Sequence, residues 1–259
     1  MRIIAVWLAL SFFTHVNAQS VPSIAQFDIT LEANQTLPLG DKISFQISTS
    51  NPLAISEKLH NWPAIKTQII DSNKLLIEMS ERPTFSGKVS PKYLLDSFVI
   101  DVSEKSTTEF AAGFINSNHL PLELPTLVAY VAEYINQPTY INGFNIASVV
   151  ATQRSGDCTE YAVLLTALAR SVGLSARVII GTVIIEEKEK ISAFGHAWVE
   201  VWHNEQWNIL DAALYKSRAL KHFYLPASEL ENEGPGFTMS LAKATTLLPN
   251  KIRGLRNAN

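Results

Sequence analysis

Short stretches of alternating apolar and polar residues dominate the first part of the chain. They include residues 27–31, 43–47 and 74–78, and residues typical of turns separate them. Alternation with a period of two is typical of strands that bury one face. We therefore expect residues 19–105 to form a small β-rich N-terminal domain.

The pattern changes near residue 106. Apolar positions with helical spacing predict helices over residues 124–135, 143–152 and 157–172. Strands are predicted after them, over residues 177–185, 197–202 and 207–210. Helices followed by antiparallel strands favour an α+β domain over residues 106–259, with the helices packed on the sheet.

The first residues resemble an export signal. Arg2 precedes an almost unbroken apolar run over residues 3–13, and small residues follow at Val16 and Ala18. A helix of this length rises about 16 Å, whereas a bilayer core is roughly 30 Å thick. We therefore expect residues 1–18 to be a cleaved signal peptide, although an uncleaved anchor or a buried helix remains an alternative. The mature protein would be periplasmic or secreted, with no stable membrane insertion.

Composition narrows the function classes only a little. The chain is 47% hydrophobic and 17% charged, which is typical of a folded globular protein. A formal net charge of −3 argues against a nucleic acid as the partner. Residues 235–259 carry four basic residues and no acidic one, and we interpret them as a solvated terminus.

The chain contains a single cysteine, Cys158. One cysteine cannot form an intramolecular disulfide, so in an exported protein it is either a working thiol or a small buried apolar residue. Gly156 permits a sharp turn before it, and Asp157 can cap a helix that begins with Cys158. Unpaired N–H groups and the helix dipole would then lower the thiol pKa and offer donors to an oxyanion.

Two later residues are candidate partners for this thiol. His196 lies in an alternating segment that predicts a strand, and Asp211 ends the next strand. A hairpin centred near Asn204 would place His196 opposite residue 212, one position from Asp211. A histidine oriented by a carboxylate is the partner that a nucleophilic thiol requires.

Three blocks of the sequence, residues 154–162, 196–200 and 207–211, resemble the signature segments of the transglutaminase-like superfamily, in particular its bacterial exported cysteine peptidases. The similarity covers roughly residues 110–215. It implies a papain-like fold, with Cys158 as nucleophile, His196 as general base and acid, and Asp211 as the orienting carboxylate. It also implies acyl transfer through a thioester, with a protein or peptide as substrate and no cofactor.

Two details of the site stay open. The backbone N–H of Cys158 is the first candidate for an oxyanion donor, and the side chain of Gln153 is a tentative second one. Some relatives use an upstream Trp, but no Trp lies between Trp62 and Cys158. We expect no metal, because a structural zinc site takes four ligands, commonly in close pairs, and these three residues are far apart in the sequence.

The sequence therefore predicts an exported thiol enzyme that acts on amide bonds of proteins or peptides. Hydrolysis is favoured over amine transfer, because no segment indicates a site for an acceptor amine. The alternative is a catalytically silent transglutaminase-like protein that binds a partner or serves as a scaffold, or an assembly factor that acts through its N-terminal region. The substrate and the oligomeric state are not predicted.

Overall fold

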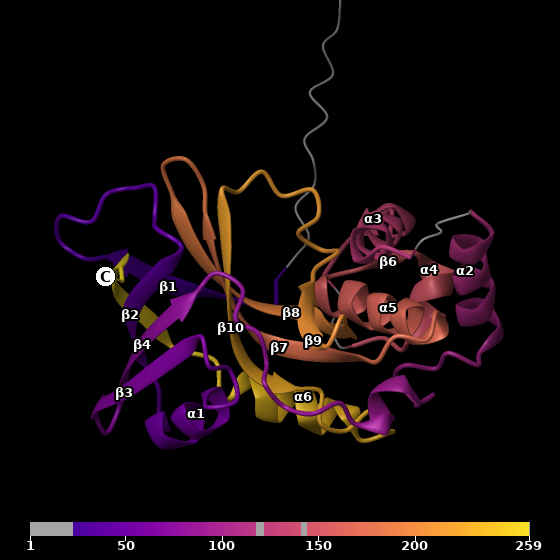
Figure 1. The fold of residues 1–259 in the computed structure, drawn as a ribbon, viewed down its shortest axis with the longest axis horizontal. Helices are drawn as coiled ribbons and strands as arrows, with labels where there is room; N and C mark the ends of the chain where they lie inside the picture. Colours follow the sequence, from indigo (N-terminus) through magenta and orange to yellow (C-terminus); the bar gives the residue numbers. More distant parts are fainter. Residues whose placement is uncertain (1–22, 118–121, 141–143, 259) are drawn as a thin grey trace, which may run out of the picture.

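A computed structural model describes residues 23–117, 122–140 and 144–258. The predicted signal peptide, residues 1–18, lies outside the described residues, as does the first residue of the predicted helix 143–152. The expected α+β class is confirmed, because helices pack on a mostly antiparallel, curled sheet (Figure 1).

The N-terminal region contains the expected strands and two elements that the pattern did not reveal. The predicted strands are β1 (Ala25–Leu31), β2 (Lys42–Ser48) and β4 (Lys74–Ser80). The other two are the helix α1 (Pro52–Leu59) and the strand β3 (Ile65–Asp71). Helix α1 is short, and the Asn51 side chain caps it by accepting from the backbone N–H of Ala54 at 3.1 Å. Strand β3 is an edge strand whose last four residues are exposed, so it lacks the alternation of a half-buried strand.

The second half supplies the strands β7 (Ala176–Glu186), β8 (Ile191–His203), β9 (Gln206–Leu210) and β10 (Lys221–Glu229). Of the described strands, β7 and β8 are the longest. The nine-stranded sheet has the order β10-β7-β8-β1-β11-β2-β4-β3, and β9 pairs with β8. The short strands β5 (Gln137–Pro138) and β6 (Ser155–Gly156) form a separate pair.

The interpretation of residues 235–259 as a solvated terminus is wrong. These residues form the helix α6 (Phe237–Thr245) and the strand β11 (Lys251–Asn257), which lies between β1 and β2. Strand β11 buries Ile252 and Leu255 completely, while its basic side chains lie on the exposed face. The strand does not alternate regularly, because its register shifts between Arg253 and Arg256 and Gly254 has φ of 60°, so the pattern of apolar residues did not indicate a strand.

The pairing of β1 with β11 is relevant to the division of the chain into domains. Strand β1 is hydrogen-bonded to β8, and β11 connects β1 to the other N-terminal strands, so one sheet runs through both halves of the sequence. The C-terminus therefore lies beside the N-terminal strands, at the left of Figure 1. The proposed domain boundary at residue 105 stays a prediction.

Helices cover one end of the sheet. They are the short 3₁₀ helix η1 (Pro91–Leu94) and the α-helices α2 (Lys105–Asn116), α3 (Leu124–Tyr134), α4 (Ala147–Gln153) and α5 (Cys158–Ser171). Helix α5 lies at the centre of this group and packs on β7 and β8, as Figure 1 shows. Every residue of α5 from Cys158 to Arg170 is buried, so it is a core helix that is enclosed on all sides.

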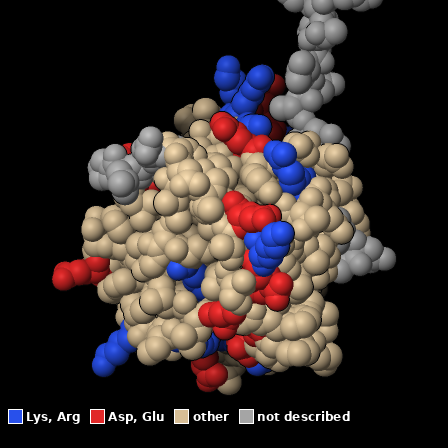
Figure 2. Space-filling model, turned by 90° about the vertical axis from the view of Figure 1, so that its right-hand side faces the viewer, with Lys and Arg blue, Asp and Glu red and all other residues tan. Residues whose placement is uncertain are grey.

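The helical side of the molecule is largely uncharged at its surface. Figure 2 shows this side, on which acidic and basic side chains are interspersed and do not gather into one basic patch. No helix among the residues that the structure describes is long and apolar enough to cross a membrane.

Candidate active site

The turn before α5 determines where the candidate nucleophile lies. Gly156 has φ of 155°, and a Cβ at this position would lie 2.3 Å from the Glu160 Cβ. Asp157 then caps the helix as predicted, because its side chain accepts from the backbone N–H of Thr159 at 2.9 Å. Glu160 completes a capping box by accepting from the backbone N–H of Asp157 at 3.0 Å. These contacts fix Cys158 in the first turn of α5.

Cys158 is fully buried, with 0% of its surface exposed. It lies within the core between α5, its neighbouring helices and the sheet. Its thiol forms a hydrogen bond with His196, and this bond is one cause of the raised pKa of that histidine.

His196 lies in the middle of β8, opposite Gly181 of β7. Its Nε2 atom is 2.8 Å from Oδ2 of Asp211, and both side chains are only 4% exposed. The structure therefore brings together Cys158, His196 and Asp211 in that order of contact, with the imidazole in the middle.

The hairpin that joins β8 and β9 is confirmed, but its register differs by one residue from our prediction. Trp202 pairs with Trp207, and Asn204 and Glu205 form the turn with positive φ values of 52° and 62°. The pairing ends before His196 is reached. Contact with Asp211 follows from where the chain leaves β9, rather than from a cross-strand pair.

Asp211 accepts three hydrogen bonds. Its Oδ1 atom accepts from the backbone N–H of Leu214 at 3.0 Å. Its Oδ2 atom accepts from the Tyr224 hydroxyl at 2.9 Å and also contacts His196. Tyr224 was absent from the predicted site, because its strand β10 had not been recognised and no local motif marks it.

The charged forms of His196 and Asp211 stabilise each other. Burial alone would lower the pKa of His196, but the charge and hydrogen bond of Asp211, together with the hydrogen bond of Cys158, raise it to about 10. Burial would raise the pKa of Asp211, but the charge and hydrogen bond of His196 and the other two donors lower it. At neutral pH the site therefore contains an imidazolium and a carboxylate.

A cavity of about 600 Å³ borders the carboxylate end of this group. Asp211 and Tyr224 line it, whereas Cys158 and His196 do not. Arg82 and His222 contribute polar groups to its walls. The walls also include apolar residues of α3, of the end of β9 and of the segment after it: Leu124, Pro125, Val128, Leu210 and Leu214.

Gln153 lies apart from this group. It is exposed at the C-terminal end of α4 and lines a surface groove with residues of α2. The described contacts do not join it to Cys158, so we do not carry it into the proposed mechanism. The backbone N–H of Cys158 remains a predicted oxyanion donor.

Glu160 is a buried carboxylate that the capping box uses for structure. Its Oε1 atom accepts from the backbone N–H of Asn145 at 2.9 Å, and Oε2 accepts from that of Asp157. Burial, followed by the charge of Asp157, raises the pKa of Glu160 to about 7. Both oxygens are engaged, which favours a role in fixing the loop around Cys158.

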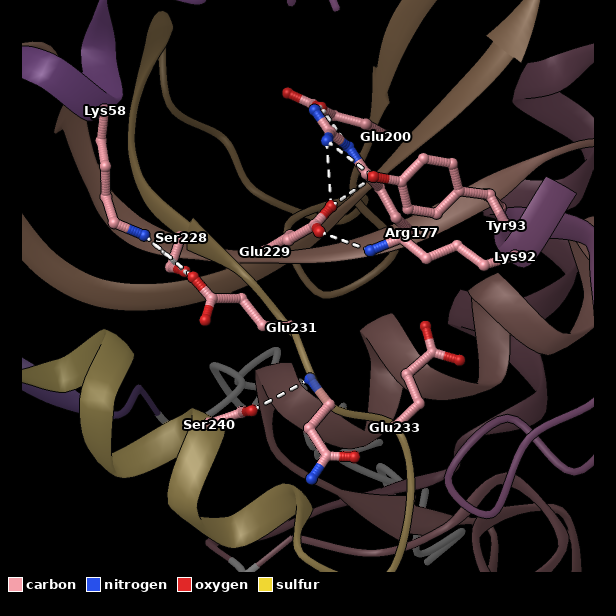
Figure 3. A network of polar contacts seen from close by, with 12 residues as sticks. Lys58, Lys92, Tyr93, Arg177, Glu200, Ser228, Glu229, Glu231, Glu233 and Ser240 are labelled. Carbon is pink, nitrogen blue, oxygen red and sulfur yellow. Dashed lines mark hydrogen bonds and ion pairs between the residues drawn. The ribbon is translucent and has the colours of Figure 1, made fainter. Parts of the chain in front are cut away.

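Strand β8 carries a second buried charge pair, four residues after His196. Glu200 Oε2 accepts from Arg177 Nη2 at 2.5 Å, and Trp62 donates its indole N–H to Glu200 Oε1 at 3.1 Å. Figure 3 shows that the same arginine also reaches Glu229, beside Tyr93. Glu200 is therefore held by an arginine and an indole N–H on its two oxygens.

Aromatic rings enclose the Arg177 guanidinium. Its central carbon lies 3.8 Å from the ring centre of Phe85 and 4.7 Å from that of Trp207. Phe85, Trp62 and Tyr93 belong to the N-terminal part of the chain, so this cluster attaches that part to the sheet that carries His196.

Among the residues that the structure describes, no cluster of three or more His, Cys, Asp or Glu side chains could hold a metal ion. Cys158, His196 and Asp211 bring together a thiol, an imidazole and a carboxylate.

Comparison with known proteins finds one family model that matches part of the chain. Residues 113–212 match the Transglutaminase-like superfamily, and this match includes Cys158, His196 and Asp211. No curated protein matches the chain.

The chain also resembles several solved structures. One is a candidate cysteine protease from Cytophaga hutchinsonii, with 14% identity, a TM-score of 0.41 and 78% of each chain covered. Another is the periplasmic domain of TgpA from Pseudomonas aeruginosa, with 16% identity and a TM-score of 0.43, covering 76% of this chain and 84% of that one. A third is a TGase with 15% identity and a TM-score of 0.29, covering 71% and 55%.

Proposed function

We propose that this protein is a thiol enzyme that cleaves amide bonds of proteins or peptides through a thioester on Cys158. The match of residues 113–212 to the Transglutaminase-like superfamily supports this proposal. The observation that carries the proposal is the ordered contact of Cys158 with His196 and of His196 with Asp211 at 2.8 Å. A thiol enzyme needs a nucleophile, a proton carrier and an orienting acceptor in this sequence of contacts.

In the first half of the reaction, the sulfur of Cys158 attacks the amide carbonyl carbon as a thiolate. The His196 imidazolium then gives its proton to the leaving nitrogen as the C–N bond breaks. The products of this step are a free amine, a thioester and a neutral imidazole. Asp211 keeps the imidazole in the orientation that both proton transfers require.

In the second half, water attacks the thioester and gives a proton to His196. The thiolate leaves, and the imidazolium–thiolate pair is restored with release of a carboxylic acid. A primary amine in place of water would give a new amide. We propose hydrolysis, because no feature of the sequence marks a site for an acceptor amine.

The predicted signal peptide supports export to the periplasm or the exterior, which we include in the proposal. An exported protein with a single cysteine has no use for it as an intramolecular disulfide, and this favours a working thiol.

Mass spectrometry of the intact protein tests the proposal. After incubation with an activated acyl donor, wild type gains the mass of one acyl group and the Cys158→Ala variant gains none. A glutamine-rich protein with an isotope-labelled primary amine then separates the two outcomes. Deamidation faster than amine incorporation supports the hydrolase, and the reverse order of rates identifies an acyltransferase.

The alternative is a catalytically silent binding protein, and one observation favours it. Cys158 is 0% exposed, so in this conformation no substrate carbonyl reaches the sulfur. If wild type gains no acyl mass from any activated donor, while it still binds denatured proteins or peptides, the binding function replaces the enzymatic one.

A further inference from the structure

A tyrosine hydroxyl shares the carboxylate oxygen that His196 contacts. The Tyr224 hydroxyl donates to Oδ2 of Asp211 at 2.9 Å, and Nε2 of His196 lies 2.8 Å from the same atom. The backbone N–H of Leu214 holds the other oxygen, Oδ1, at 3.0 Å. Donors thus engage both oxygens, and they resist rotation of the carboxylate about its Cβ–Cγ bond.

The fold fixes the position of Tyr224 itself. The residue is 1% exposed, and in the β10–β7 pairing it faces Val183. Its backbone N–H donates to the carbonyl of Glu81 at 3.1 Å. Its ring meets that of Trp198 edge-on at 5.2 Å, and the Trp198 ring lies 6.4 Å from the His196 ring in a stacked arrangement. The hydroxyl therefore has little freedom to move away from Asp211.

The hydroxyl keeps its proton throughout the working pH range. Burial, followed by the negative charge of Asp211, raises the pKa of Tyr224 well above its usual value. A protonated hydroxyl beside a carboxylate must donate to it, so the direction of this hydrogen bond is fixed.

We infer that Tyr224 is a positioning residue of the active site, which holds Asp211 so that the imidazole of His196 stays aligned with Cys158. This inference rests on the proposed function, because alignment matters only if His196 transfers protons. Tyr224 acts through Asp211 and does not itself contact the reacting atoms.

Tyr224 also borders the cavity next to Asp211. Loss of its hydroxyl would leave Oδ2 with a single donor and would open space for water beside a buried carboxylate. The pKa of Asp211 would then rise, because its carboxylate has lost a donor. The pKa of His196 would rise as well, because the negative charge of Asp211 is no longer shared with the tyrosine hydroxyl. Both changes move the pH dependence of the reaction to higher pH.

The test compares Tyr224→Phe with Tyr161→Phe. Tyr161 is a matched control, because it is 3% exposed and its hydroxyl donates to the carbonyl of Ile135 at 3.4 Å, away from Asp211. Both substitutions remove one buried hydroxyl. We expect Tyr224→Phe to lower kcat about ten- to hundredfold with KM unchanged, as for loss of a hydrogen bond to a charged group. Its pH–rate profile should shift upward, whereas Tyr161→Phe keeps the wild-type profile.

An NMR titration of the His196 imidazole gives a readout that does not require turnover. Its midpoint should rise in Tyr224→Phe and stay constant in Tyr161→Phe. An unchanged midpoint in Tyr224→Phe, or equal effects of the two substitutions, overturns the inference. If wild type forms no acyl-enzyme at all, the proposed function fails instead, and the titration still decides whether Tyr224 acts on the Asp211–His196 pair.

Discussion

Strand β8 carries two buried charge pairs only four residues apart, and they differ in what surrounds them. Around Arg177 and Glu200, the charged groups are matched by one another and by Glu229 (Figure 3). The indole N–H of Trp62 and the ring of Phe85 complete their surroundings. Around His196 and Asp211, one partner is a thiol, and a cavity borders the carboxylate. The Arg177–Glu200 pair contacts only side chains that stabilise the fold, so its role is structural. The His196–Asp211 pair includes an imidazole beside a thiol, so it can transfer a proton.

The largest expected effect separates the two pairs by activity. His196→Gln removes the proton carrier and should lower kcat/KM by about a thousandfold or more, as removal of a catalytic histidine does in other nucleophilic enzymes. Glu200→Gln should leave the rate per folded molecule within about threefold, because Glu200 contacts no reacting atom. Steady-state kinetics below the unfolding temperature measures both. Equal losses in the two variants would contradict the distinction.

The next effect is on stability, and it is expected at the Arg177–Glu200 pair. Arg177→Met leaves the Glu200 carboxylate buried without its cation and should lower the free energy of unfolding by about 3–5 kcal/mol. Lys105→Ala is the control, because it breaks the exposed Lys105–Glu109 pair and should cost less than about 1 kcal/mol. Denaturant titration gives both values. A loss near that of the control for Arg177→Met would mean that the cluster does not attach the N-terminal part to the sheet.

The third effect is a difference in pH dependence. The pKa of His196 is raised to about 10 in the folded protein, above its value of about 6.5 when unfolded. The stability from this shift is therefore fully present below about pH 6.5 and is lost as the pH rises through 10. The free energy of unfolding should fall between pH 7 and 10 in wild type and fall less in His196→Gln. Parallel curves would contradict the raised pKa.

How far the sequence predicts this site depends on the range of the interactions involved. The cap at Asp157, the helix that starts at Cys158 and the β8–β9 hairpin arise from neighbouring residues, and periodicity reveals them. The resemblance to a family then selected the three residues that the structure brings together. The hairpin register was one residue off because the turn needs positive φ at both Asn204 and Glu205, which the sequence does not display as Asn-Gly.

Other features depend on strands that meet only in the folded sheet. Tyr224 contacts Asp211 through β10, which pairs with β7 rather than with a sequence neighbour. The Arg177–Glu200 pair takes its other partners from distant parts of the chain, because Tyr93 and Glu229 contact Arg177 and Trp62 donates to Glu200. Strand β11 joins the N-terminal strands from the other end of the sequence. No local pattern encodes such non-local pairings, so these parts could not be predicted.

The most direct test of the central claim is the pH dependence of Cys158 alkylation. Cys158 is the only cysteine, so iodoacetamide modifies a single thiol. The alkylation rate at pH 6 is divided by the alkylation rate at pH 9 of the same protein. Because access to the buried sulfur slows both rates, it cancels in this ratio. If the His196 imidazolium maintains a thiolate, this ratio is close to one in wild type and falls about a hundredfold in His196→Gln, which lacks the imidazolium. A ratio in wild type equal to that of a model thiol would contradict the claim that Cys158 and His196 form a working pair.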